Sequence, residues 1–248
     1  MLYLTTRFVY ILAMNRIDSP RKGSRRLLAA VALLIMSVNG PAAEPIGQAE
    51  YVEMTGSKRL LLTSWELPKS DGILLESRSE NGEQHEVFVD KSLETRWWDY
   101  RDPAKGIDIH AQRNGSAILV NGTLKGKPIE RREEIDSASW YQSIERSLES
   151  FALAPAGTTM EFWILQPDTL RARKIQARTE GVDRLMIEGR SVSAARVRIS
   201  LPGFLAAFWS SSYWYRLSDG KFVRFEGLHG PPGSPLTTVE LIRSRGTQ

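Results

Sequence analysis

Apolar and polar residues alternate with a period of two along much of the chain after about residue 59. In residues 86–90, 107–112 and 196–201, most apolar side chains occupy every second position, with charged or polar ones between them. Successive side chains of a β-strand point to opposite faces, so this pattern predicts strands that each bury one face. Further strands are expected over residues 160–166, 170–179, 185–188, 190–201, 213–217, 222–226 and 237–243.

Turn dipeptides separate the expected strands at four places, which are Asn81-Gly82, Asn114-Gly115, Asn121-Gly122 and Asp219-Gly220. Asn, Asp and Gly tolerate the positive φ that two-residue hairpin turns require. Parallel strands would need helical crossovers, and the chain lacks a helical pattern between most of its strands. The pattern therefore predicts consecutive antiparallel pairing in a meander.

One amphipathic helix is expected within residues 139–155. The apolar positions recur at spacings of four, four and three, and the intervening positions are polar. The apolar stripe would be Trp140, Ile144, Leu148 and Phe151, with Gln142, Glu145, Arg146 and Glu149 opposite it. Ser139 with Gln142 resembles a capping box, and Pro155 would end the helix.

These elements predict a mainly β fold. A long run of antiparallel strands has to hide its edges, and curling the sheet achieves this. We expect a strongly curved antiparallel sheet, a half-barrel or open barrel, with the single amphipathic helix packed on its concave side. No repeat, low-complexity tract or linker divides residues 44–248, which indicates a single domain.

The N-terminus has the parts of a secretory signal peptide. A basic segment at residues 16–26 precedes a ten-residue apolar run, Leu27 to Met36, and small residues follow at Ala42 and Ala43. The run is shorter than the roughly 20 residues that a membrane-spanning helix needs. We expect residues 1–43 to be removed on export, by a Sec-type route in preference to the twin-arginine route that Arg25-Arg26 would allow. Met14 is an alternative start, with residues 1–13 as an upstream extension.

The charge of the chain without the leader and its lack of cysteine limit the classes of function. Six of the 33 basic and one of the 29 acidic residues lie in residues 1–43, which leaves 27 basic and 28 acidic groups. Bulk charge then gives no argument for nucleic acid or for an anionic membrane. The chain contains no cysteine, which excludes disulfides, thiolate metal sites and a lipid-modified N-terminal cysteine. We expect a periplasmic or secreted protein with at most peripheral membrane contact.

Three segments carry a family resemblance. They are EFWILQPDTL (residues 161–170), YWYRLSDGKFVRFEG (residues 213–227) and GPPG (residues 230–233). Together they resemble a family of exported bacterial proteins of unknown function whose β-rich fold is similar to that of periplasmic lipoprotein carriers. The resemblance is strongest over residues 159–243. It implies a carrier-like half-barrel and brings no catalytic residues.

Two sets of residues are candidates for binding. Residues 202–209 are apolar on nearly every side and would either plug the barrel mouth or form an apolar lip. Phe204, Leu205, Phe208 and Trp209 would gate a cavity, and Trp140 and Ile144 would line it. The alternative site would hold a polar ring-shaped ligand through Trp98, Asp99 and Arg101. The same segment could instead be an ordinary strand, with Trp97 in the core and Trp98 on the other face.

No catalytic motif or cofactor site stands out in the sequence. The histidines at 85, 110 and 229 are far apart, and neither a nucleophile elbow nor a phosphate-binding loop is present. The leading expectation is a non-enzymatic binding or carrier module for an apolar ligand such as a lipid or acyl chain. The rival expectation is an envelope scaffold whose aromatics fill the core and which binds other envelope proteins. A glycan enzyme using Asp99 or Asp102 comes third.

Overall fold

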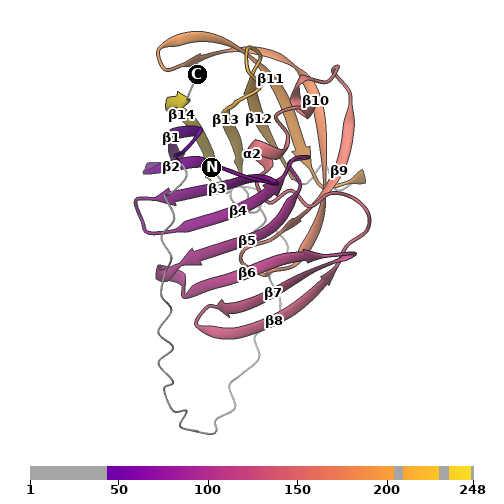
Figure 1. The fold of residues 1–248 in the computed structure, drawn as a ribbon. Coiled ribbons are helices and arrows are strands. Elements are labelled where there is room, and N and C mark those ends of the chain that lie inside the picture. Colours follow the sequence, from indigo (N-terminus) through magenta and orange to yellow (C-terminus); the bar gives the residue numbers. More distant parts are fainter. Residues whose placement is uncertain (1–43, 204–208, 229–234, 247–248) are drawn as a thin grey trace, which may run out of the picture.

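A computed structural model describes residues 44–203, 209–228 and 235–246. They form one antiparallel sheet of 14 strands in the order β8-β7-β6-β5-β4-β3-β2-β1-β14-β13-β12-β11-β10-β9 (Figure 1). The strands are β1 (Gly47–Thr55), β2 (Lys58–Lys69), β3 (Gly72–Ser79), β4 (Gln84–Asp90), β5 (Thr95–Asp102), β6 (Ile107–Asn114), β7 (Ala117–Leu124), β8 (Lys127–Glu134), β9 (Thr159–Leu165), β10 (Ala172–Ile187), β11 (Arg190–Ser200), β12 (Ser210–Arg216), β13 (Phe222–Leu228) and β14 (Leu236–Gly246). The prediction of a mainly β, antiparallel fold is confirmed.

The sheet consists of two meanders joined through the terminal strands. β1 pairs with β14 from Gly47↔Gly246 to Thr55↔Thr237, so the first and last strands of the chain are neighbours. β8 and β9 are consecutive in sequence but lie at the two opposite edges of the sheet. The simple meander expected from the turn signals therefore breaks once, at residues 135–158, which return the chain from one edge to the other.

Three of the four predicted turns join neighbouring strands, and one does not. Asn121-Gly122 lies inside β7, where Asn121 pairs with His110 of β6. A Cβ atom on Gly122 would lie 2.2 Å from the carbonyl oxygen of Asp108, so glycine allows the two backbones to approach closely. The actual turn between β7 and β8 follows at Lys125 and Gly126, which both have positive φ.

Two clusters of buried side chains fill most of the space between the two halves of the sheet. The first combines β1, β2 and β9–β14 and includes Phe162, Tyr213 and Phe225. The second combines β3–β7 with the end of β9 and includes Trp98 and Leu165. In both clusters most of the buried side chains come from alternate positions of the strands, as the period of two predicts. Trp98 of β5 is fully buried and Trp97 only partly, so the strand prediction for this segment is confirmed and its expected faces are reversed.

Polar contacts link the edge strand β8 to the connection between β9 and β10 at the other side of the sheet. Oε2 of Glu133 on β8 accepts a hydrogen bond from the backbone N–H of Ala172 at 3.0 Å, and Arg171 donates to Oε1 of the same carboxylate at 3.0 Å. Arg131 of β8 also donates to the carbonyl oxygen of Thr169. The start of β10 is therefore fastened to β8 by polar groups.

The connection from β8 to β9 is mostly extended. Its helices are α2 (Ile144–Ser147) and the 3₁₀ turn η3 (Phe151–Leu153); a second 3₁₀ turn, η2 (Pro103–Lys105), lies between β5 and β6. The single longer helix expected around residues 140–151 is not confirmed. Residue 140 instead bridges strands, because its carbonyl oxygen accepts from Thr95 N–H at 2.9 Å and the N–H of Tyr141 donates to the carbonyl oxygen of Trp163 at 2.9 Å. Extended pairing of this kind competes with helix formation.

The polar positions of the same segment are also buried. Gln142 and Glu145 have no exposed surface, and Glu149 is 6% exposed. The side opposite the expected apolar stripe is therefore buried as well, because the segment lies between the two halves of the sheet. Gln142 is satisfied by β9: its amide donates to the carbonyl oxygen of Leu165 at 3.1 Å and accepts from the Leu165 N–H at 2.9 Å.

The predicted leader, residues 1–43, and the GPPG segment lie outside the described residues. Over the part of the chain that is described, no helix has the length and hydrophobicity needed to cross a bilayer.

Candidate functional site: a cavity at one end of the sheet

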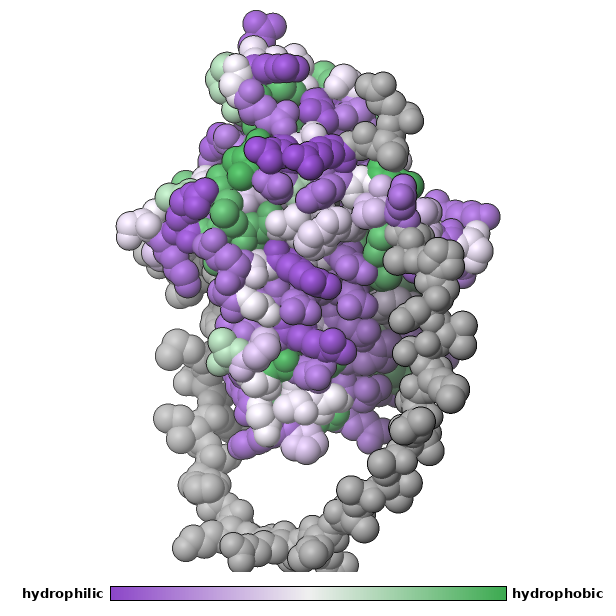
Figure 2. Space-filling view, turned by 60° about the vertical axis from the view of Figure 1, so that its left-hand side comes forward, coloured by the Kyte–Doolittle hydropathy of each residue, from purple (hydrophilic) through white to green (hydrophobic). Residues whose placement is uncertain are grey.

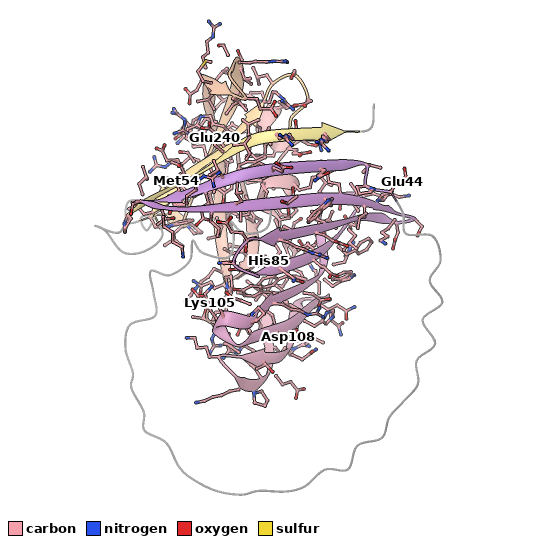
Figure 3. All side chains as sticks on the ribbon, turned by 90° about the vertical axis from the view of Figure 1, so that its left-hand side faces the viewer. Glu44, Met54, His85, Lys105, Asp108 and Glu240 are labelled. Carbon is pink, nitrogen blue, oxygen red and sulfur yellow. The ribbon has the colours of Figure 1, made fainter. Side chains whose placement is uncertain are left out.

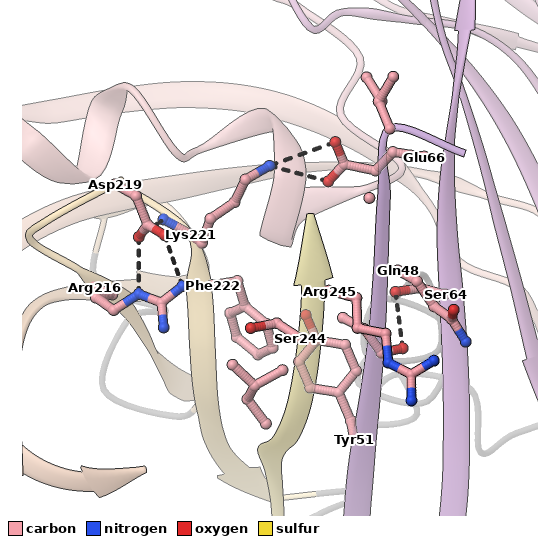
Figure 4. A pocket seen from close by; sticks show the side chains of 14 residues that line it. Gln48, Tyr51, Ser64, Glu66, Arg216, Asp219, Lys221, Phe222, Ser244 and Arg245 are labelled. Carbon is pink, nitrogen blue, oxygen red and sulfur yellow. Dashed lines mark hydrogen bonds and ion pairs between the residues drawn. The ribbon is translucent and has the colours of Figure 1, made fainter. Parts of the chain in front are cut away.

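A cavity of about 160 Å³ lies where β1 begins and β14 ends (Figure 4). It is bounded by β1, β2, the end of β14 and the β12–β13 turn. In Figure 3, Glu44 marks the end of β1 that carries the cavity, and Met54 marks the opposite end. The lining residues are Ile46, Gly47, Gln48, Ala49, Tyr51, Ser64, Glu66, Arg216, Asp219, Lys221, Phe222, Leu241, Ser244 and Arg245.

Small residues on adjacent strands create this space. Ala49 of β1 pairs with Ser64 of β2 on one side and with Ser244 of β14 on the other. Gly47, two positions earlier on β1, also lines the cavity. On the same strands, the next interior positions carry larger side chains such as Tyr51, Leu62 and Leu241. A row of small side chains across three strands leaves a volume that the neighbouring residues do not close.

The floor of the cavity is apolar and aromatic. Tyr51, Phe222 and Leu241 are at most 3% exposed, and the rings of Tyr51 and Phe222 lie 5.7 Å apart, centroid to centroid. Burial raises the pKa of Tyr51 well above its ordinary value, with smaller contributions from Glu145 and Glu66. The phenol therefore stays neutral, and the floor offers a ligand an uncharged, mainly apolar surface.

Charged pairs form one wall of the cavity. Nζ of Lys221 lies 3.1 and 3.4 Å from the two carboxylate oxygens of Glu66 and 3.6 Å from Oε1 of Glu149. Arg216 binds both oxygens of Asp219, at 2.9 and 2.6 Å. Figure 4 shows these two pairs on the same side of the cavity, away from Arg245. The wall is thus polar but largely self-neutralised.

A buried acidic residue lies behind this wall. Glu145, in α2, has no exposed surface, and neither of its carboxylate oxygens has a hydrogen-bond partner within the described residues. Burial raises the pKa of Glu145 to about 8, and the neighbouring Glu149 adds to the increase. Burial likewise raises the pKa of Glu149 to about 7, against the opposing effect of Arg146 and Lys221. At neutral pH Glu145 is therefore mainly a neutral carboxylic acid.

The predicted apolar ligand residues are not part of this cavity. Trp140 and Ile144 are both fully buried, but they belong to different clusters, Trp140 with Leu165 and Ile144 with Phe162. Trp209 is 9% exposed. It precedes β12 at the end of the sheet opposite to the cavity. The other three predicted gate residues, Phe204, Leu205 and Phe208, lie outside the described residues.

The predicted polar ligand residues are separated by the sheet. Trp98 is fully buried and donates its indole N–H to His85. Asp99 and Arg101 face the other way, where Asp99 binds His110 at 2.5 Å and Arg101 lies 3.3 Å from Asp108. The three side chains do not meet on one surface.

Within the described ranges, no group of three or more histidine, aspartate and glutamate side chains has a geometry that could hold a metal ion. The cavity residues themselves were not anticipated from the sequence. The only signal for them is local, since Gly47, Ala49 and Ser64 are small residues at interior positions of otherwise large-residue strands.

Comparison with known proteins supports the fold. No family model matches the chain, and no curated protein sequence matches it significantly. A β-barrel-like protein of the DUF1849 domain of unknown function, from Brucella abortus, has a TM-score of 0.50 at 7% identity and covers 84% of this chain and all of that one. A hypothetical lipoprotein of Escherichia coli, YmcC, has a TM-score of 0.42 at 12% identity, covering 82% of this chain and 86% of that one.

A LolA superfamily protein of Nitrosomonas europaea has a TM-score of 0.25 at 8% identity, covering 85% of this chain and 89% of that one. At these identities the likeness concerns the fold alone, and only the first of the three scores is high enough to carry an argument. The comparison therefore supports a β-barrel-like fold similar to that of a bacterial domain of unknown function.

Proposed function

We propose that the protein is a non-enzymatic binding or carrier module that holds the apolar end of an amphipathic ligand, such as a lipid or an acyl chain. The observation that supports this proposal is the cavity at the start of β1, with its apolar floor and polar wall. Binding sites for small ligands commonly combine an apolar lining with a few polar groups that orient the ligand.

The size of the cavity limits what enters. An enclosed apolar cavity of about 150 Å³ holds a ligand the size of benzene. The cavity of about 160 Å³ would therefore take one ring or the end of a hydrocarbon chain, and a longer ligand would extend through the mouth beside Arg245. The ligand would be gripped at one end rather than enclosed along its length.

The experiment compares two leucine substitutions at adjacent residues of β2. Ser64→Leu places a large side chain in the cavity, whereas Thr63→Leu places the same side chain on the opposite face of the strand. Each purified protein is titrated with octanoate and dodecanoate by calorimetry, and lipids carried through purification are identified by native mass spectrometry and solvent extraction. We expect binding by the wild type and by Thr63→Leu, and at least tenfold weaker binding by Ser64→Leu. Clean apo protein that binds neither probe would refute the carrier function.

The filled interior favours a second candidate, an envelope scaffold. Two aromatic-rich clusters occupy most of the space between the halves of the sheet, which is what a protein with no small-molecule ligand requires. This candidate predicts that proteins, and no lipids, co-purify from the cell envelope.

Both candidate functions are placed outside the cytoplasm. The basic and apolar segments within residues 16–36, with Ala42 and Ala43 after them, support removal of residues 1–43 and a periplasmic or secreted location for residues 44–248 as one domain. The mass of the protein recovered from the periplasmic fraction tests this. A mature N-terminus near residue 44 is expected, and recovery of the intact chain in the cytoplasm would contradict it.

A further inference from the structure

Exposed apolar side chains are concentrated at the cavity end of the molecule. Seven large apolar side chains are exposed among the described residues, and six of them are at this end: Ile46, Leu153, Val182, Met186, Leu217 and Ile242. The seventh, Leu236, begins β14 at the opposite end. Scattered single exposures are ordinary for soluble proteins, but a concentration at one end indicates an interaction surface.

Four of the six side chains lie on the elements that border the cavity or next to them. Ile46 lines the cavity itself, and Ile242 lies near the end of β14, where the pairing with β1 is interrupted by a bulge. Leu217 follows β12 and donates its backbone N–H to Ser193 at the start of β11. Leu153 lies next to the β12–β13 turn, 3.6 Å from where a Cβ atom on Gly220 would be.

The β10–β11 hairpin supplies the most exposed pair. It arches over this end of the sheet toward β14 (Figure 1), and the carboxylate of Glu188 at its tip accepts a hydrogen bond from the backbone N–H of Ser244 at 3.0 Å. Val182 and Met186 on this hairpin are 60% and 63% exposed. Figure 2, which brings the β1 and β14 side forward, shows apolar side chains in the upper half of this face among strongly hydrophilic ones.

Basic side chains without counter-charges stand among these apolar residues. Arg184 lies between Val182 and Met186 in the sequence, Arg190 follows the hairpin tip, and Arg245 lies at the cavity mouth. All three are exposed, and none forms an ion pair with any residue that the structure describes. Glu188 at the hairpin tip and Glu44 before β1 are exposed acidic groups at the same end, so the three arginines leave a small local excess of positive charge there.

We infer that the cavity end, defined here as the six apolar residues above together with Arg184, Arg190 and Arg245, docks on the surface of a membrane that contains anionic lipids. A surface of this kind gains affinity from apolar side chains that enter the headgroup region and from arginines that meet anionic headgroups. The charge complementarity favours a lipid surface over a second copy of the chain, because the same arginines would repel one another across a two-fold interface. This inference is independent of the cavity's ligand, since it uses exposure and charge alone.

The test is vesicle co-sedimentation of the purified protein, with vesicles of 30% phosphatidylglycerol in phosphatidylcholine compared with pure phosphatidylcholine. The mass of the protein is checked first, because a retained apolar run at residues 27–36 would bind lipid by itself. We expect partitioning onto the anionic vesicles at least tenfold stronger than onto the neutral ones, and weaker partitioning at high salt.

Two variants and two matched controls locate the surface. Arg184→Glu with Arg190→Glu, and Val182→Ser with Met186→Ser, should each weaken binding to anionic vesicles at least tenfold. Lys58→Glu with Arg59→Glu, and Leu236→Ser, alter exposed residues at the opposite end and should change it less than twofold.

Absence of binding to anionic vesicles, or equal losses in the variants and the controls, would overturn the inference. The same holds if the Val182→Ser, Met186→Ser protein loses a dimer seen by light scattering while lipid binding is absent, because the surface would then be a protein interface. The Ser64→Leu protein, in which the cavity is filled, should dock normally, which separates this result from the test of the carrier function.

Discussion

The indole N–H of Trp98 donates a hydrogen bond to Nδ1 of His85 over 3.1 Å. Since Nδ1 accepts, the ring proton lies on Nε2, which is 3.1 Å from Oε1 of Glu83. All three side chains are at most 1% exposed, and the rings of His85 and Tyr100 stack at 4.5 Å, centroid to centroid. In Figure 3, His85 and Lys105 lie on the lower strands, away from the cavity end marked by Glu44. These contacts hold the His85 ring in its neutral form, in the half of the sheet that lacks the cavity.

The first prediction concerns acid stability through His85. Burial lowers the pKa of His85 below its ordinary value of 6.5, and the hydrogen bond that His85 donates to Glu83 only partly opposes this. The unfolded chain takes up a proton near pH 6.5 while the folded chain does not, so this residue makes the free energy of unfolding fall as the pH drops below 6.5. The slope is at most about 1.4 kcal/mol per pH unit.

Urea unfolding of the wild type and of His85→Gln at pH 7.5, 6.5 and 5.5 checks this prediction. The variant should be less stable at pH 7.5, and the difference between the two proteins should shrink as the pH falls. Gln112→Ala is the control, because Gln112 is an exposed, non-ionisable residue of β6. A constant difference across the three pH values would contradict the prediction.

The second prediction concerns Gln142, which ties the β8–β9 connection to β9. Its amide exchanges two hydrogen bonds with the backbone of Leu165 and accepts a third from the Trp140 indole at 3.0 Å. In Gln142→Ala these three buried partners lose their hydrogen bonds, at roughly 1–3 kcal/mol each. We expect the free energy of unfolding to fall by about 3 kcal/mol or more, measured by urea denaturation. Gln112→Ala, on the exposed face of β6, should cost less than 1 kcal/mol, and equal losses would argue against the role given to Gln142.

The alternation of apolar and polar residues predicts the individual strands. It does not predict which distant strands pair, because pairing depends on contacts between residues far apart in the sequence. Residues 107–111 alternate strictly and form β6 as predicted, because the period of two is a property of a single strand. The pairing of Gly47 with Gly246 joins the two ends of the domain, and no feature of either strand alone specifies it. Asn121-Gly122 has the composition of a turn, yet the glycine serves a close contact with Asp108 of the neighbouring strand.

The site was less predictable than the fold for the same reason. The cavity exists because Ala49, Ser64 and Ser244 lie side by side on three strands, and their adjacency appears only when β1 is placed between β2 and β14. Glu145 has the sequence position of a solvated helix residue, but the segment that carries it passes through the interior of the curled sheet. Trp98 and Trp140 were predicted to contact a ligand, and in the fold both are buried and pack in the interior.

The third prediction concerns the β10–β11 hairpin and the contact at its tip. Glu188 has a φ of 52° and precedes Gly189, with a φ of 72°, as in a two-residue hairpin turn. Glu188→Asn keeps a residue that tolerates this conformation and shortens the side chain that reaches Ser244. Hydrogen exchange followed by mass spectrometry should show faster exchange in residues 185–192, with the free energy of global unfolding changed by less than 1 kcal/mol.

A matched control is Glu134→Gln, which alters an exposed carboxylate on the edge strand β8. It should leave exchange in residues 185–192 unchanged. If Glu188→Asn also leaves exchange in residues 185–192 unchanged, the hydrogen bond to Ser244 does not hold the hairpin in place.

The fourth prediction is that the protein carries a destabilising acid at Glu145. Its pKa rises from 4.5 in a solvated chain to about 8 in the fold, chiefly through burial. The folded chain therefore keeps a proton that the unfolded chain releases, and the free energy of unfolding contributed by this residue falls as the pH rises from about 4.5 to 8. Glu145→Gln removes the titration and should stabilise the protein on the order of 3 kcal/mol more at pH 8 than at pH 5. Urea denaturation at pH 5, 6.5 and 8 measures the difference, with Glu134→Gln as the exposed control.

A buried group that costs stability is retained where it has another use, so Glu145→Gln should also be titrated with octanoate. A change in affinity without a loss of stability would link this acid to the cavity that lies beyond Tyr51.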